Sequence, residues 1–154
     1  MASQSKTGLM ARALAEAQAA GARGEVPVGA VVSAADGTIL AAAGNRTREL
    51  SDPTAHAEML AIRAACVALG AERLTGCDLT VTLEPCPMCA TAISFARIRR
   101  LYFAASDAKG GGVEHGARIF NQPTCHHAPE VYGGIAATEA SALLVSFFAA
   151  RRQI

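Results

Sequence analysis

Two short motifs constrain the fold of this chain more than any other part of it. One is Pro-Cys-Pro-Met-Cys at residues 85–89, and the other is His-Ala-Glu at residues 56–58. The run Leu-Thr-Val-Thr-Leu at 79–83 comes just before the cysteines and indicates a buried strand. The prolines suit the first turn of a helix, where an N–H group needs no helical partner. Cysteines three apart lie on one side of such a turn, and a helix N-terminus favours the metal-binding thiolate form. The sequence therefore predicts a metal-binding turn between a strand and a helix.

His56 also stands at the start of a helical pattern, an apolar run that continues to Leu69. One histidine and two cysteines, Cys86 and Cys89, give three ligands, one fewer than a closed tetrahedral zinc site. Three protein ligands plus water are typical of catalytic zinc, so we expect one zinc ion per chain. Glu58 is left without a ligand role and is predicted to transfer protons as a general acid and base.

The alternative is a closed structural zinc site with a fourth protein ligand. The chain offers several candidates for that ligand: Cys77, His115, Cys125, His126 and His127. The adjacent residues 125–127 also resemble a metal-binding tract of their own. We interpret that tract as a feature of a loop, because the three-ligand site is complete without it.

Composition places the chain among well-packed single domains, and we expect one domain over residues 1–154. Hydrophobic residues make up 51% and charged residues 18%, and no apolar run approaches the roughly 20 residues of a transmembrane helix. The N-terminal residues have no secretory apolar core, and five cysteines are an odd number that argues against a disulfide framework. A cytoplasmic protein without a membrane partner is therefore expected. The net charge of only +1 means that any nucleic-acid surface must be a local cluster of cations.

The hydrophobic patterns predict an α/β sandwich in which an initial hairpin makes the sheet mixed. A long loop, 106–129, contains three consecutive glycines and one helical turn near 117–120, and loops of this length are usually functional or disordered. The last helix is expected to turn its large apolar residues inward: Leu143, Leu144, Phe147 and Phe148. Helices are expected at 9–20, 56–69, 86–97 and 138–152, and strands at 26–32, 38–43, 79–83, 99–105 and 131–136.

His-x-Glu followed by Pro-Cys-x-x-Cys is a signature of zinc-dependent nucleobase deaminases, and the chain resembles the bacterial tRNA adenosine deaminase family in particular. The matching segments are 25–31, 45–46, 52–59, 81–89, 107–109 and, in the last helix, 146–152. The resemblance implies a cytidine deaminase-like three-layer α/β/α sandwich with a five-stranded mixed sheet. It also implies a homodimer that converts adenosine to inosine at the wobble position of a tRNA anticodon.

The resemblance further implies residues that bind the RNA. Asn45 would hold the target base, and Asp107 would contact a flanking nucleotide. The backbone N–H of Ala57, at a helix start, is a candidate for orienting the attacked group. Cations predicted to meet phosphates are Arg46, Lys109, Arg151 and Arg152.

Two other functions remain open at the level of sequence. A deaminase of a free base or nucleoside, such as guanine, cytosine or cytidine, would use the same zinc site. A non-catalytic, zinc-stabilised nucleic-acid-binding module would use a closed site, which the three-ligand count and Glu58 argue against.

Overall fold

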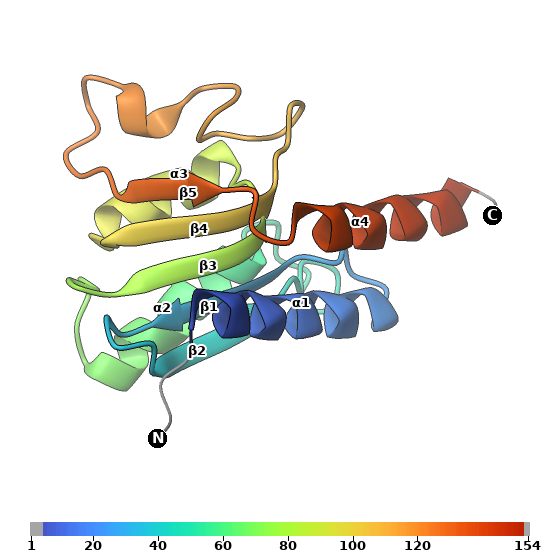
Figure 1. Ribbon diagram of the computed structural model, residues 1–154, viewed down its shortest axis with the longest axis horizontal. Coiled ribbons are helices and arrows are strands. Elements are labelled where there is room, and N and C mark those ends of the chain that lie inside the picture. Colours follow the sequence, from blue (N-terminus) through green and yellow to red (C-terminus); the bar gives the residue numbers. More distant parts are fainter. Residues whose placement is uncertain (1–4, 153–154) are drawn as a thin grey trace.

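A computed structural model describes the backbone of residues 5–152 and the side chains of residues 5–151. Helices and strands alternate along the chain (Figure 1). The helices are α1 (Lys6–Ala22), α2 (Ala57–Leu69), α3 (Pro87–Phe95) and α4 (Ala137–Arg152), with a short 3-10 turn, η1 (Ile119–Asn121). The strands are β1 (Gly29–Ser33), β2 (Ile39–Gly44), β3 (Asp78–Leu83), β4 (Arg100–Ala105) and β5 (Glu130–Gly133).

The strands form one five-stranded mixed sheet in the order β2-β1-β3-β4-β5. The hairpin partner β2 and the central strand β3 both run antiparallel to β1, whereas β4 and β5 run parallel to β3. The predicted mixed sheet with a leading hairpin is therefore confirmed.

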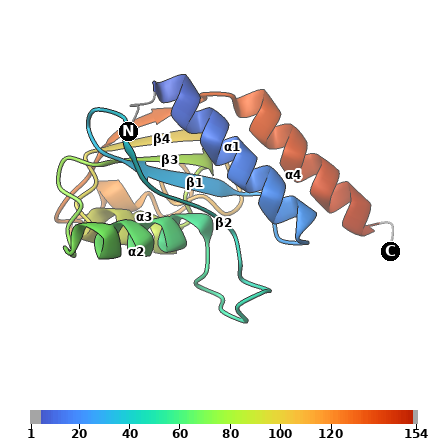
Figure 2. The same cartoon turned by 90° about the horizontal axis from the view of Figure 1, so that it is seen from below.

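Helices cover both faces of the sheet, with α1 and α4 on one side and α2 and α3 on the other (Figure 2). The side chains of β1 alternate between the two resulting cores. Ala30 and Val32 pack in the larger core with α2 and α3, and Val31 packs in the smaller core with α1. This period of two is the ordinary alternation of a strand, and the result is the predicted three-layer sandwich.

Local signals set several element ends. The α2 helix stops at Gly70, which takes the left-handed conformation at φ 62° that glycine adopts without strain. Gly29 begins β1 where α1 crosses it, and a Cβ there would overlap the backbone oxygen of Ala13. The absence of a side chain at this point therefore lets α1 lie directly on the sheet.

Some expected boundaries and faces were wrong. The first strand begins at Gly29 rather than at residue 26, and α1 runs through Gly21 to Ala22. Phe148 does not turn inward but is 42% exposed, while Phe147 is partly buried. Within residues 5–152, no helix combines the length and the apolar character needed to cross a membrane.

Candidate active site

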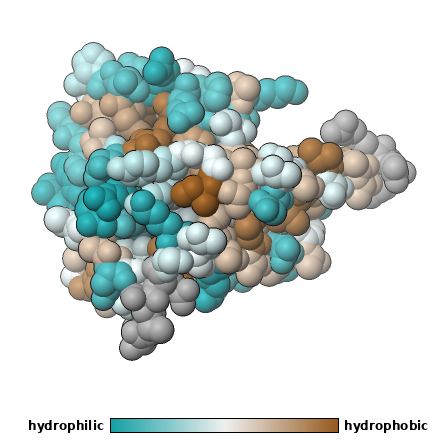
Figure 3. Space-filling view, viewed as in Figure 1, coloured by the Kyte–Doolittle hydropathy of each residue, from teal (hydrophilic) through white to brown (hydrophobic). Residues whose placement is uncertain are grey.

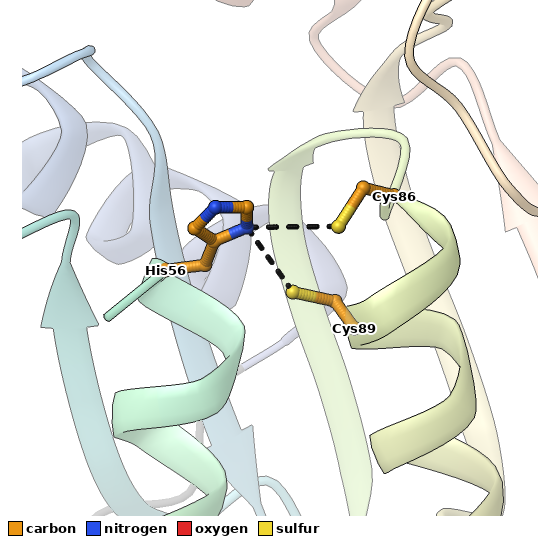
Figure 4. A group of neighbouring side chains, drawn as sticks. All are labelled: His56, Cys86 and Cys89. Atoms are coloured by element: carbon orange, nitrogen blue, oxygen red, sulfur yellow. Dashed lines mark hydrogen bonds between the residues drawn. The ribbon is translucent and has the colours of Figure 1, made fainter. Parts of the chain in front are cut away.

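His56, Cys86 and Cys89 come together between the starts of α2 and α3 (Figure 4). His56 immediately precedes α2, Cys86 immediately precedes α3, and Cys89 lies in the first turn of α3. Neither His56 nor Cys86 uses its side chain to cap its own helix. His56 Nδ1 lies 3.6 Å from Cys86 Sγ and 3.4 Å from Cys89 Sγ. The two helix starts thus converge on one point, as the sequence led us to expect.

The spacing of these three donor atoms fits a zinc ion. Bonds of about 2.3 Å to sulfur and about 2.1 Å to nitrogen, in a tetrahedral arrangement, would hold nitrogen and sulfur roughly 3.6 Å apart. Among the residues that the structure describes, this is the one group of three potential ligands close enough to share a metal ion. No fourth side chain within residues 5–151 joins the group, so the donor set is that of an open site.

The charge of the cysteine pair also suits a cation. The pKa of the Cys86 thiol is lowered to about 4, chiefly by the hydrogen bond from Cys89 and also by His56. The same bond raises the pKa of Cys89. Cys86 is therefore favoured as the thiolate while Cys89 keeps its proton, and a divalent cation bound by two thiolates would replace that proton.

Two residues of the tract at 125–127 make hydrogen bonds to the protein backbone. His127 Nε2 lies 2.7 Å from the backbone oxygen of Ile98, and the Cys125 thiol donates to the backbone oxygen of His127 at 3.1 Å. The first contact fastens the loop to the turn between α3 and β4, and the second lies within the loop. The interpretation of the tract as a loop feature is consistent with this arrangement.

Glu58 lies in the first turn of α2 beside the donor group and is only 4% exposed. Burial is the main reason why the pKa of its carboxyl rises to about 7, since little water is present to stabilise the charge. A carboxyl with that pKa can both accept and release a proton near neutral pH. Glu58 therefore has the burial and the proton affinity that the predicted acid and base role requires.

A pocket of about 290 Å³ gives access to His56, Glu58 and Cys86. Its remaining lining residues are Val26, Val28, Asn45, Thr47, Leu83, Glu84, Asp107 and Gly110. A larger groove of about 540 Å³ lies between α1 and α4, but it contains none of the three donor residues. The smaller pocket is accordingly the candidate site for chemistry.

Asn45 lines this pocket and is fixed in place by a hydrogen bond from α2. The backbone N–H of Ala57 donates to Asn45 Oδ1 at 2.7 Å. The bond leaves the amide N–H₂ group of Asn45 as a donor for a ligand. The Ala57 N–H already donates to Asn45, so in this structure it positions Asn45. Direct contact of Ala57 or Asn45 with a substrate stays a prediction.

The other predicted RNA contacts lie at the margin of the pocket or beyond it. Asp107 lines the pocket, and its Oδ1 accepts hydrogen bonds from the backbone of Lys109 and Gly110 at 3.2 and 2.9 Å. The Lys109 side chain is exposed next to it. Arg46 forms a two-pronged ion pair with Glu49 at 2.7 and 2.8 Å and is not a lining residue.

Arg151, a cation of α4, lies away from this margin. Arg151 lines the α1–α4 groove, where it donates to the backbone oxygen of Gly24 and stacks on Phe147 with 4.4 Å to the ring centroid. The side chain of Arg152 lies outside the described residues. For these two arginines, phosphate contact stays a prediction.

Two buried carboxylates without a predicted role bind backbone N–H groups of segments next to the pocket. Glu25, 2% exposed, accepts the backbone N–H groups of Arg48 and Glu49 at 3.1 and 2.8 Å. Glu84, also 2% exposed, accepts those of the segment 107–115. Burial raises the pKa of each carboxyl, but the hydrogen bonds outweigh it and leave both pKa values lowered. An acidic residue next to an apolar strand indicates a buried carboxylate that must have hydrogen-bond partners. The sequence does not show which residues those partners are.

A buried carboxyl beside an open His-Cys-Cys group at two helix starts is the arrangement of a zinc-dependent deaminase. Residues 3–105 match the cytidine and deoxycytidylate deaminase zinc-binding region. A tRNA-specific adenosine deaminase of Agrobacterium fabrum is 62% identical over 147 residues, which cover 96% of both chains. This chain belongs to the family of tRNA-specific adenosine deaminases.

Solved structures agree with this assignment. A structure from studies of A-to-I editing by tRNA:A34 deaminases superposes with a TM-score of 0.88 at 64% identity, covering 90% of this chain and 99% of that one. A guanine deaminase from Bacillus subtilis is less similar, with a TM-score of 0.66 at 31% identity, covering 98% of this chain and 96% of that one. The shared fold therefore extends to enzymes that act on a free base.

Proposed function

We propose that this protein converts adenosine to inosine at the wobble position of a tRNA anticodon. One zinc ion per chain would be held by His56, Cys86 and Cys89, and Glu58 would move the protons. The observation that carries the proposal is the buried Glu58 carboxyl beside the three-ligand group. The strong similarity to enzymes of that activity supports the choice of substrate.

The chemistry divides between the metal and the side chains. Zinc, when bound, supplies a Lewis acid that makes water nucleophilic near neutral pH. Glu58 accepts a proton from the attacking water and delivers protons to the purine ring nitrogen and to the departing amine. Addition of water at C6 and loss of ammonia turn adenosine into inosine. Asn45, held by Ala57, would donate from its amide to the edge of the base.

The size of the pocket favours a single base that is already out of its stack. A volume of about 290 Å³ suits one nucleobase, not a base pair. Enzymes of this kind act on unpaired bases or extrude the target, at a cost of a few kcal/mol. An anticodon loop presents its bases without opening a helix, so it offers the wobble adenosine at little cost.

The principal rival is a deaminase of free guanine or another small base. The decisive experiment compares deamination of an adenosine-34 anticodon stem-loop with that of guanine, cytosine, cytidine and adenosine at matched concentrations. A stem-loop with guanosine in place of the wobble adenosine is the matched control. We expect turnover of the first stem-loop alone. Efficient turnover of free guanine together with an untouched stem-loop would overturn the proposal.

Two further features belong to the same proposal. The tRNA substrate implies a cytoplasmic location. A homodimer is also proposed, and it is supported by large apolar side chains left exposed on the α2–α3 layer, Val67 at 83% and Phe95 at 71%. Sedimentation of Phe95→Ser should then show a shift from dimer to monomer, and an unshifted dimer would exclude this surface.

A further inference from the structure

Glu84 receives more hydrogen bonds than any other side chain near the pocket, and all of them come from one segment. Its Oε1 accepts from the backbone N–H of Asp107 at 3.0 Å and from His115 Nδ1 at 2.7 Å. Its Oε2 accepts from the backbone N–H groups of Val113, Glu114 and His115 at 3.2, 2.9 and 3.1 Å. The side chain itself has no exposed surface. One carboxylate therefore gathers both ends of the segment 107–115.

The three consecutive glycines at 110–112 explain how the segment comes so close. A Cβ at Gly111 would collide with Glu84 Oε2 and with the backbone oxygen of Asp107. A Cβ at Gly112 would lie 2.6 Å from Pro87 N, and the Gly112 N–H donates to the backbone oxygen of Pro85 at 2.8 Å. The segment thus lies directly against the turn that carries Cys86, with no room for side chains between them.

The same segment supplies one wall of the pocket. Asp107 and Gly110 line the pocket, and Lys109 stands exposed between them. The position of the 107–110 wall relative to the cysteines consequently depends on Glu84.

We propose that Glu84 is a positioning residue that holds the segment 107–115 in register with the zinc-binding turn, so that the RNA-facing wall stands at a fixed distance from the reacting base. Within residues 5–151, His115 is the one residue whose side chain donates a hydrogen bond to Glu84. The proposal rests on the proposed function for its substrate. Glu84 would affect how tightly the substrate binds by positioning the wall, and Glu58 and the metal would carry out the chemistry.

The test uses the full chain loaded with zinc and the variant Glu84→Gln. The amide keeps the size of the side chain but places an N–H₂ group against backbone donors. We expect KM for the adenosine-34 stem-loop to rise roughly 10- to 100-fold, the range typical of residues that orient a site from outside it. The kcat should stay within about threefold of the native value, because Glu58 and the zinc content are unchanged. A KM equal to that of the native protein would overturn the proposal.

Asp78→Asn is a matched control for general loss of stability. Asp78 is a buried carboxylate at the opposite end of β3, where it accepts two hydrogen bonds from Arg99 at 3.0 and 2.7 Å. This variant should lower the thermal midpoint and leave KM unchanged. An equal rise of KM in both variants would mean that lost stability, not the position of the wall, is responsible, and would overturn the proposal.

Two further variants keep the test decisive if Glu84→Gln does not fold. Gly111→Ala leaves the carboxylate intact but pushes the segment away from it, and it should raise KM in the same way. His115→Phe removes one of the five hydrogen bonds, so it should raise KM by about threefold at most. A native KM in Gly111→Ala would count against the proposal.

A measurement without substrate separates this proposal from the proposed function. Hydrogen exchange of the amides of Val113, Glu114 and His115 should become at least about tenfold faster in Glu84→Gln, because their acceptor is lost. If the native protein does not turn over the stem-loop, the proposed function fails. Faster exchange in Glu84→Gln would still support the role of Glu84 in holding the segment 107–115. Unchanged exchange would exclude it whatever the substrate is.

Discussion

The floor of the pocket and its rim are built from different parts of the chain. The floor consists of His56, Glu58, Cys86 and Cys89, which come from two helix starts and lie within two short motifs. Glu58 and Cys89 are buried, and the other two are partly buried. Backbone geometry at a helix start is rigid, so the floor is held with the precision that proton transfer and metal binding require.

The rim consists of loop residues that depend on distant partners. Asn45 takes its position from Ala57, and the segment with Asp107 and Lys109 takes its position from Glu84, 23 residues earlier in the chain. Within the rim, Lys109 and Gly110 are exposed, Asp107 is partly buried and Asn45 is buried. Figure 3 shows the face covered by α1 and α4, where hydrophobic residues gather over these two helices. From this contrast we expect the floor to determine the reaction and the rim to determine the substrate. Changes in the floor should therefore lower kcat, and changes in the rim should raise KM.

The largest effect is expected when the metal site in the floor is broken. Cys86→Ala removes one of three ligands, so zinc per chain should fall to background and deamination should be lost. Metal analysis of the purified protein measures this directly. Cys66→Ala, which alters a partly buried thiol of α2 outside the group, is the matched control and should keep its zinc. Full zinc occupancy in Cys86→Ala would contradict the assignment of the ligand.

A smaller but still large effect is expected when the floor loses its proton carrier. Glu58→Gln keeps the size of the side chain and should keep the zinc, while kcat falls roughly 10²–10⁴-fold. The matched control is Glu139→Gln, because Glu139 also lies in the first turn of a helix, α4, but is exposed. Near-native turnover by Glu58→Gln would mean that Glu58 does not transfer protons and only complements the dipole of α2.

The same contrast explains what the sequence could and could not predict. The floor was predictable because local patterns define it: the strand-like run 79–83, the prolines at a helix start, and the spacing of His56 from Glu58. Helix α2 was placed correctly for the same reason. A run of apolar residues predicts the helix, and Gly70 marks its end. These features depend on residues a few positions apart.

The rim could not be derived in this way. The role of Glu84 depends on backbone donors 23 to 31 residues away, which no local pattern reveals. Phe148 was assigned to the core because helical periodicity identifies an apolar side chain but not whether a neighbouring element covers it. The start of β1 was misplaced because Val26 and Val28 are apolar without pairing in the strand; they line the pocket instead.

The smallest expected effect concerns a single charge on the rim, and it separates a phosphate contact from a structural one. Lys109 is exposed beside the pocket and forms no ion pair within residues 5–151. Each phosphate neutralised in single-stranded RNA contributes a slope of about −0.7 to the dependence of log binding on log salt. Lys109→Ala should therefore make the slope for the anticodon stem-loop shallower by about 0.7, raise KM, and leave kcat and zinc unchanged.

Arg12→Ala provides the control for this measurement, because Arg12 lies on α1, across the sheet from α2 and α3, and is paired with Glu16 at 3.1 Å. The slope for Arg12→Ala should match that of the native protein.

Arg151→Ala extends the comparison, since Arg151 already binds Gly24 and stacks on Phe147. A loss of thermal stability with an unchanged slope would make Arg151 a structural residue of the α1–α4 groove. A shallower slope would instead show that the RNA reaches α4. An unchanged slope in Lys109→Ala would remove the 107–110 segment from the RNA interface and leave the rim without its best-placed cation.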